Sequence, residues 1–280
     1  MLSLLCVSAM PVQSNNGDIK SDLDILNFAL TLEHLESAFY KEGMSKFTSQ
    51  SFKDAGFGDN IYPLFQQIAG NENTHVTKLT SVIQGLNGTP VPACKYDFKL
   101  TDVQSFVDTS KALENTGVSA YLGASKDILD HNILSLAASI LTVEARQGAT
   151  LNFIEKDSPF PNNFDVGLDP REIISIASQF IVECSYELPK SFPPFKISQE
   201  SGKVGDSVSI SFDGKQDNLY CAFLAGGGYN YFVPLSEGQC KLPEDIMLGD
   251  IFIILTTASK MDDFNDGTTI AGPASFTIEK

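Results

Sequence analysis

The sequence predicts an α+β protein in two parts, a four-helix bundle with a fifth helix followed by a small β-sandwich. Up to about Leu188, apolar residues recur with the spacing of one helix face. After residue 195, apolar and polar residues alternate, as they do in half-buried strands. The stretch between the two patterns is rich in proline, which cannot continue a helix. We therefore expect the bundle at 15–188, a linker at 189–195 and the β-rich part at 196–280.

Composition indicates a folded chain that does not bind nucleic acid. The 280 residues are 42% hydrophobic and 19% charged, which provides apolar side chains for one or two cores. The formal net charge is -16, and an anionic surface repels the phosphate backbone of nucleic acids. Every apolar run is shorter than a membrane span requires. We expect neither a nucleic-acid partner nor a membrane-spanning segment.

Residues 1–14 form a short apolar run that ends in small residues, as a secretory signal does. They lack the basic segment that usually precedes the apolar region, and a disordered tail is the alternative interpretation. The signal interpretation predicts a secreted protein of the extracellular space or cell wall.

The cysteines fit a secreted protein as well. Removal of Cys6 with the signal leaves four, an even number that suits disulfide bonds. Pairing Cys94 with Cys184 and Cys221 with Cys240 is the economical arrangement, because it keeps each bond within one part of the chain. Four cysteines allow three connectivities, and buried free thiols are a further alternative.

Start and stop signals divide the first part into five helices. Ser21 is the expected cap of the first, Thr101-Asp102 of the third, and an Asp-Pro pair at 169–170 opens the fifth. The second helix ends at residues 87–90, where Gly88 is expected in the left-handed conformation. The expected helices cover 22–43, 61–86, 101–124, 130–156 and 169–188, with a polar loop at 46–60 and a long crossing segment at 91–100.

Four of these helices carry a glutamate within an apolar run. A carboxylate on a buried helix face needs a neutralising partner, so four of them predict a shared cation or shared protons. The second helix adds a histidine one turn after its glutamate, and the fourth has a glutamine at the matching place. These residues are Glu33, Glu72, His75, Glu114, Glu144 and Gln147. Polar residues on helix surfaces are the alternative interpretation.

Other residues on the same helices have two interpretations. Glu36, one turn after Glu33, fits an inward or a solvent-exposed position about equally. Tyr40 and Tyr121 would either hydrogen-bond the carboxylates or pack in the core. Gly117 and Gly123 stand inside the third helix, where glycine is costly, and predict a close approach or a kink.

Inward glutamates on four helices, with Glu-x-x-His on one of them, resemble the ferritin-like di-iron bundle. The resemblance is closest to the secreted ferritin-like family that includes fungal stress-response and sexual-development proteins and plant desiccation-related proteins. It covers the helical two-thirds of the chain. The stretches that carry it are LNFAL at 26–30, ENTHV at 72–76, NTGVSAYLGA at 115–124 and SILTVEAR at 139–146.

This resemblance implies that the six residues bind iron or another divalent metal such as manganese or zinc. The sequence departs from the family's ligand pattern at Gln147, which stands where the family has a second histidine. An amide oxygen is a weaker metal ligand than imidazole. Three interpretations follow: a single or mixed metal site, a two-metal site that is weak near Glu144, or a metal-free bundle in which Gln147 hydrogen-bonds the carboxylates.

The second part of the chain reads as short strands separated by glycine, aspartate and proline turns. Strands at this spacing resemble a small immunoglobulin-like β-sandwich. The expected strands are 207–212, 220–224, 229–233, 251–255 and 274–278, with a hairpin turn at 226–228.

The function that this reading predicts is a secreted stress- or development-associated protein whose bundle binds a divalent metal at an incomplete di-iron-type site. The alternative is a non-enzymatic structural or interaction protein with a metal-free bundle. In that case the sandwich, with Tyr229, Tyr231 and Phe232 exposed, would contact a protein or a cell-wall glycan. An enzyme of the ferroxidase or oxygenase type is a third hypothesis.

Overall fold

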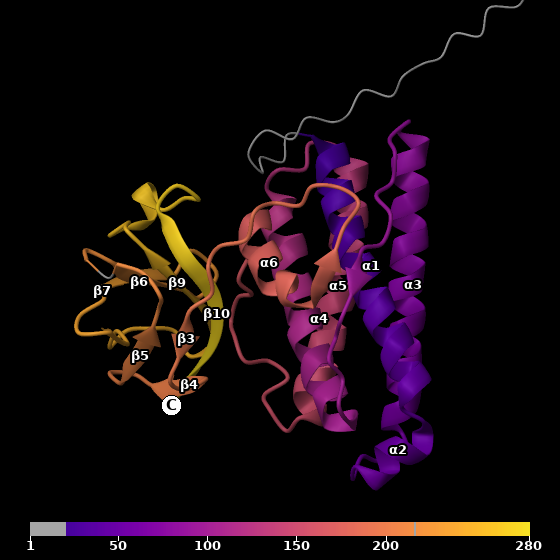
Figure 1. The fold of residues 1–280 in the computed structure, drawn as a ribbon, viewed down its shortest axis with the longest axis horizontal. Coiled ribbons are helices and arrows are strands. Elements are labelled where there is room, and N and C mark those ends of the chain that lie inside the picture. The colour runs from indigo at the N-terminus through magenta and orange to yellow at the C-terminus, as the bar shows by residue number, and fades with distance from the viewer. Residues whose placement is uncertain (1–20, 216) are drawn as a thin grey trace, which may run out of the picture.

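The computed structural model describes residues 21–215 and 217–280, so the signal-like segment 1–14 lies outside the described residues. Four long helices stand side by side (Figure 1). Ser21 and Asp102 cap two of them as the sequence predicts, and Asp130 caps a third, because each accepts a hydrogen bond from a backbone N–H of the first turn. The four helices are α1 (Asp22–Lys46), α3 (Ile61–Gly85), α4 (Val103–Ser125) and α5 (His131–Ile154).

The connection between α1 and α3 contains a short helix, α2 (Ser49–Asp54), where a loop was expected. Thr48 and Ser51 form a capping box, in which each side chain bonds the backbone of the other residue. Phe52, in the middle of the helix, is buried against the rings of Tyr62 and Phe65. Phe52 is the buried residue of α2, and the polar composition of 46–60 did not indicate a helix there.

The end of α3 also differs from expectation in one residue. Asn87, with φ of 59°, takes the left-handed conformation that the sequence assigned to Gly88. The N–H of Gly88 bonds the carbonyl of Ile83, and a side chain at 88 would approach Leu23 to 2.7 Å. Glycine at 88 therefore avoids a steric clash, and Asn87 is the residue that adopts the left-handed conformation of the turn.

The fifth helix, α6 (Pro170–Ala177), is much shorter than the predicted 169–188. It passes into a single 3-10 turn, η1 (Ser178–Phe180), and then into the strand β2 (Ile181–Glu183), which pairs antiparallel with β1 (Lys95–Tyr96) of the crossing segment. The prediction was wrong because a helix through 181–183 would give up these backbone bonds.

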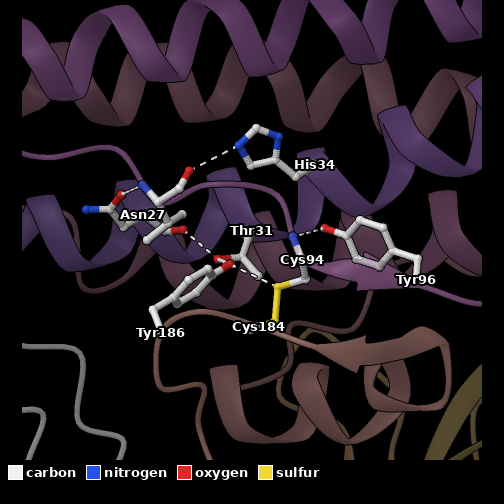
Figure 2. The surroundings of a disulfide bond; sticks show 8 residues. Asn27, Thr31, His34, Cys94, Tyr96, Cys184 and Tyr186 are labelled. Atoms are coloured by element: carbon white, nitrogen blue, oxygen red, sulfur yellow. Dashed lines mark hydrogen bonds between the residues drawn. A yellow bond between two sulfur atoms is a disulfide. The ribbon is translucent and has the colours of Figure 1, made fainter.

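A disulfide between Cys94 and Cys184 closes the same region and confirms the predicted pairing. Figure 2 shows its surroundings: the hydroxyl of Tyr186 lies 2.9 Å from Thr31 Oγ1 on α1 and 3.4 Å from Cys94 Sγ. Nearby, His34 Nε2 contacts the carbonyl of Val91 at 3.1 Å. The crossing segment is thereby held along the outer face of α1.

The C-terminal part contains two sheets. A five-stranded sheet has the order β4-β10-β9-β6-β7, and a three-stranded sheet the order β3-β5-β8. The second predicted disulfide, Cys221–Cys240, joins β6 to β8 and so links the two sheets. The strands are β3 (Lys196–Ile197), β4 (Ser201–Lys203), β5 (Ser207–Ser211), β6 (Tyr220–Leu224), β7 (Asn230–Pro234), β8 (Gln239–Lys241), β9 (Gly249–Thr256) and β10 (Thr269–Glu279).

A β-rich C-terminal domain is thus confirmed, while its likeness to an immunoglobulin module stays a prediction. Of the three aromatic residues expected on its surface, Tyr229 is half exposed, but the other two are partly buried. The Tyr231 hydroxyl donates to the Asp245 carbonyl, and Phe232 packs on Phe264. None of the described helices has the length and apolar character that a membrane crossing requires.

The bundle and the five-stranded sheet share one core. In Figure 1, α6 lies between the long helices and the sheet. Its residues Ile173 and Ile174 belong to the same buried cluster as Leu224 on β6 and Ile254 on β9. The intervening 189–195 stretch is anchored too, because Phe192 is buried beneath the guanidinium of Arg171.

Candidate metal centre

The four long helices bring all six predicted residues into the interior of the bundle. Glu33 comes from α1, Glu72 and His75 from α3, Glu114 from α4, and Glu144 and Gln147 from α5. The four glutamates are completely buried, and His75 and Gln147 are nearly so. Only polar or ionic partners can make such a set of carboxylates compatible with a dry interior.

The nitrogen Nδ1 of His75 is the meeting point of three carboxylates. It lies 3.1 Å from Glu72 Oε2, 3.2 Å from Glu33 Oε2 and 3.5 Å from Glu144 Oε1. One ring N–H serves one acceptor fully, and here only the contact with Glu72 has hydrogen-bond geometry. The four ligand atoms lie within 4.8 Å of one another.

The separations of 3.1 to 3.5 Å between His75 Nδ1 and the three carboxylate oxygens suit a small divalent cation. Ligand atoms about 2.1 Å from one ion, at right angles or wider, stand roughly 3 to 4 Å apart. Three carboxylates and one imidazole are also donors that iron, manganese and zinc accept. The residues present therefore fit one such ion on both geometry and chemistry.

Several carboxylate oxygens have no hydrogen-bond donor. Glu33 Oε2 and both oxygens of Glu144 are buried without one. Burial, and next the charge of Glu114, raise the pKa of Glu144 well above its usual value. Burial likewise raises the pKa of Glu72 to about 6 and that of Glu114 to about 7. Without a cation, burial therefore favours a proton on Glu144, while Glu72 and Glu114 take up protons at a higher pH than exposed glutamates do.

The pKa of His75 is raised, although burial acts to lower it. Burial by itself lowers the pKa of His75, but the close carboxylates of Glu144, Glu33 and Glu72 outweigh it and raise the pKa to about 12. In the absence of a cation, the imidazolium would neutralise one carboxylate, and protons on other glutamates would have to balance the rest of the charge.

Two tyrosines orient the carboxylates of α1 and α4. The hydroxyl of Tyr40 on α1 donates to Glu114 Oε1, and that of Tyr121 on α4 donates to Glu33 Oε1. Burial, followed by the neighbouring carboxylates, raises the pKa of both phenols well above the usual range, which keeps them as donors. Each helix thus holds the glutamate of the other in place.

Gln147 contacts the other residues through its amide nitrogen. Nε2 donates to Glu72 Oε1 at 2.7 Å and to Glu114 Oε2 at 2.8 Å. Its oxygen, the atom that would bind a metal, instead accepts a hydrogen bond from Asn71 Nδ2 at 2.7 Å. In this orientation Gln147 acts as a hydrogen-bond donor, the role it has in one of the three sequence interpretations.

The structure adds Glu36 to the group. It is 4% exposed, and burial, followed by the charge of Glu144, raises its pKa well above the usual value. Its spacing of three from Glu33 was visible in the sequence, but α1 is apolar on most sides, so periodicity left its direction open.

The comparisons with known proteins agree with this architecture. Residues 21–156 match the family model described as a ferritin-like domain. The chain is also similar to Protein rds1 of Schizosaccharomyces pombe, with 28% identity over 170 residues. That match covers 60% of this chain but only 41% of the length of Protein rds1.

A more distant likeness exists among solved structures. The conserved hypothetical protein rv2844 from Mycobacterium tuberculosis is 16% identical and aligns with a TM-score of 0.41, covering 51% of this chain and 96% of that one. A similarity at that level supports no conclusion about the present chain. The match of residues 21–156 to the ferritin-like domain model and the four convergent helices both support a ferritin-like fold for this part of the chain.

Proposed function

We propose that the bundle core binds a divalent metal ion through Glu33, Glu72, His75 and Glu144. The observation that carries this proposal is the single nitrogen of His75 facing three carboxylate oxygens at 3.1 to 3.5 Å. Hydrogen bonding cannot use all three contacts, whereas a shared cation can. A metal would also compensate the buried charge that otherwise costs several kcal/mol for each unpaired carboxylate.

The donor set favours iron or manganese, with zinc as a further candidate. A redox-active metal would supply one-electron chemistry at this position. The protein's own residues supply positioning: Tyr121 fixes Glu33, and Gln147, held by Asn71, fixes Glu72. We infer that Gln147 orients a ligand and is not one itself.

Metal analysis of the intact protein tests this proposal. After purification without chelator and incubation with Fe(II), Mn(II) or Zn(II), the protein should retain stoichiometric metal that Glu72→Ala or His75→Ala abolishes. His131→Ala is the matched control, because His131 is exposed at the start of α5 and should leave the metal content unchanged. Chelation should lower the melting temperature of the wild type and leave that of His75→Ala unaltered.

Absence of retained metal in the wild type would contradict the proposal. It would favour the second candidate, a metal-free bundle with a structural or interaction role. The observation behind that candidate is Gln147, whose two N–H groups already serve Glu72 and Glu114. In that case, protons bound to the glutamates whose pKa is raised would balance the buried negative charge.

We also propose that the protein is secreted and works in the extracellular space or cell wall, in a stress- or development-associated role. Two disulfides, the signal-like residues 1–14 and the resemblance of the helical part to secreted proteins support this setting. A tagged full-length protein should appear in the culture medium or wall fraction. Its retention inside the cell would contradict this part of the proposal.

A further inference from the structure

The connection that follows α3 carries an acceptor sequence for N-linked glycosylation. The residues are Asn87-Gly88-Thr89, and they form the one Asn-x-Ser/Thr triplet of the whole sequence. Such triplets also arise by chance, so the use of this one depends on where the fold places it. An acceptor asparagine must lie on the surface of a secreted protein, with room for a bulky substituent.

The two side chains that define the triplet are both exposed. Helix α3 ends at Gly85, and Asn87 and Thr89 lie in the turn and open connection that follow it. Both residues are exposed, while Gly88 between them is partly buried. The preceding Leu86 is 43% exposed, so the surface around Asn87 is open as well. The amide of residue 87 and the hydroxyl of residue 89 are therefore accessible to a transferase.

Main-chain atoms hold this turn, so the fold does not require the amide of Asn87. The N–H of Asn87 donates to the carbonyl of Gln84 at 3.0 Å, and that of Gly88 donates to the carbonyl of Ile83 at 2.9 Å. These bonds close the end of the helix in the usual way. The nitrogen Nδ2 of Asn87 can therefore carry a substituent without breaking a bond of the turn.

The middle residue of the triplet anchors it to the bundle. A Cβ atom added to Gly88 would lie 2.7 Å from a methyl carbon of Leu23 on α1 and 3.0 Å from one of Ile83 on α3. Glycine allows the backbone to approach both helices this closely. The backbone of residue 88 thus lies against the helices, and the residues on either side of it remain on the outside.

We propose that Asn87 carries an N-linked oligosaccharide. This inference rests on the proposed secretion, because only proteins of the secretory route receive this modification. In the transfer, Nδ2 of Asn87 loses a proton and bonds the anomeric carbon of the sugar, and the diphosphate of a lipid-linked oligosaccharide donor leaves. The glycan lies at the end of the bundle opposite α2 (Figure 1), where it covers Leu86.

The glycan and the proposed metal centre are far enough apart to be tested separately. Asn87 follows Glu72 by 15 residues, which corresponds to about 22 Å along the axis of α3. Removal of the glycan should therefore leave the metal content of the protein unchanged.

Expression of the full-length protein in a eukaryotic host, followed by mass spectrometry of the secreted chain, tests the proposal. Treatment with peptide N-glycosidase should remove the mass of one oligosaccharide from the wild type, and the treatment should leave Asn87→Gln and Thr89→Ala unchanged. Thr89→Ser is the matched control, because it keeps the hydroxyl and should retain the glycan. Pro90 restricts the backbone of Thr89, so we expect partial occupancy in the wild type and higher occupancy in Pro90→Ala.

The outcomes separate this inference from the secretion on which it rests. A secreted wild type whose mass the enzyme leaves unchanged would refute the glycan at Asn87 and keep the proposed secretion, whatever Pro90→Ala shows. A mass loss that persists in Asn87→Gln would place the sugar elsewhere and refute the assignment. A wild type that stays inside the cell without sugar would overturn both proposals.

Discussion

Glu172 provides a stability prediction that does not depend on any metal. This residue of α6 is 4% exposed, and its Oε2 accepts the backbone N–H of Asp169 at 2.8 Å. Burial, reinforced by the charges of Asp169 and Asp266, raises its pKa from 4.5 to about 8. The folded protein therefore favours the protonated carboxyl at neutral pH.

The sign and size of the effect follow from this difference. Because the folded pKa lies above the unfolded one, the stabilisation is complete below about pH 4.5 and is lost as the pH rises through about 8. The two values differ by about 3.5, which corresponds to roughly 5 kcal/mol over the whole range, about 4 of which are lost by pH 8.

Urea denaturation of the wild type and Glu172→Gln at several pH values between 5 and 8, with chelator present, measures the effect. Glutamine keeps an oxygen that can accept the N–H of Asp169 but does not titrate. The free energy of unfolding of the variant should therefore exceed that of the wild type by an increasing amount towards pH 8. Parallel pH dependences of the two proteins would refute the assignment of a neutral Glu172.

Two further predictions concern packing in the bundle. Phe106→Ala should lower the free energy of unfolding by about 3 to 5 kcal/mol, because this fully buried ring lies 5.0 Å from Phe39 and 5.1 Å from Phe65 between centroids. Phe153→Ala, at a 71% exposed position, is the control and should change it by less than about 0.5 kcal/mol in urea denaturation. Gly123→Ala should destabilise by about 1 to 3 kcal/mol in thermal melts, since its Cβ would lie 1.9 Å from the Leu168 carbonyl oxygen. Gly70→Ala, with nothing within 4 Å, should instead stabilise by up to about 1 kcal/mol, and equal effects of the two would contradict the packing argument.

The sequence was most informative at the glutamates that lie on otherwise apolar helix faces. Glu33, Glu72, Glu114 and Glu144 each interrupt an apolar face, and a carboxylate in such a place needs a partner wherever the fold puts it. That physical requirement made the convergence of four helices predictable. It could not show Glu36, because α1 is buried on several sides and an inward position differs little in sequence from an outward one.

Other features could not be predicted, because they depend on contacts between segments that are far apart in the sequence. The orientation of Gln147 is set by Asn71 on another helix, and no local pattern encodes which end of an amide faces inward. The early end of α6 depends on the pairing of residues 181–183 with the crossing segment. Gly123 was expected to mark a close approach of helices or a kink, and it marks a close approach to the backbone of the loop residue Leu168.

The buried cluster that joins Ile173 and Ile174 to Leu224 and Ile254 has a consequence for how the chain is divided. The ferritin-like match ends at residue 156, yet the apolar packing continues through α6 into the sheet. A fragment that ends at that boundary would expose apolar side chains to water. We expect it to associate with other apolar surfaces or to precipitate. Because the apolar interior runs without a break from the helices into the sheet, we expect the two parts to unfold as one cooperative unit.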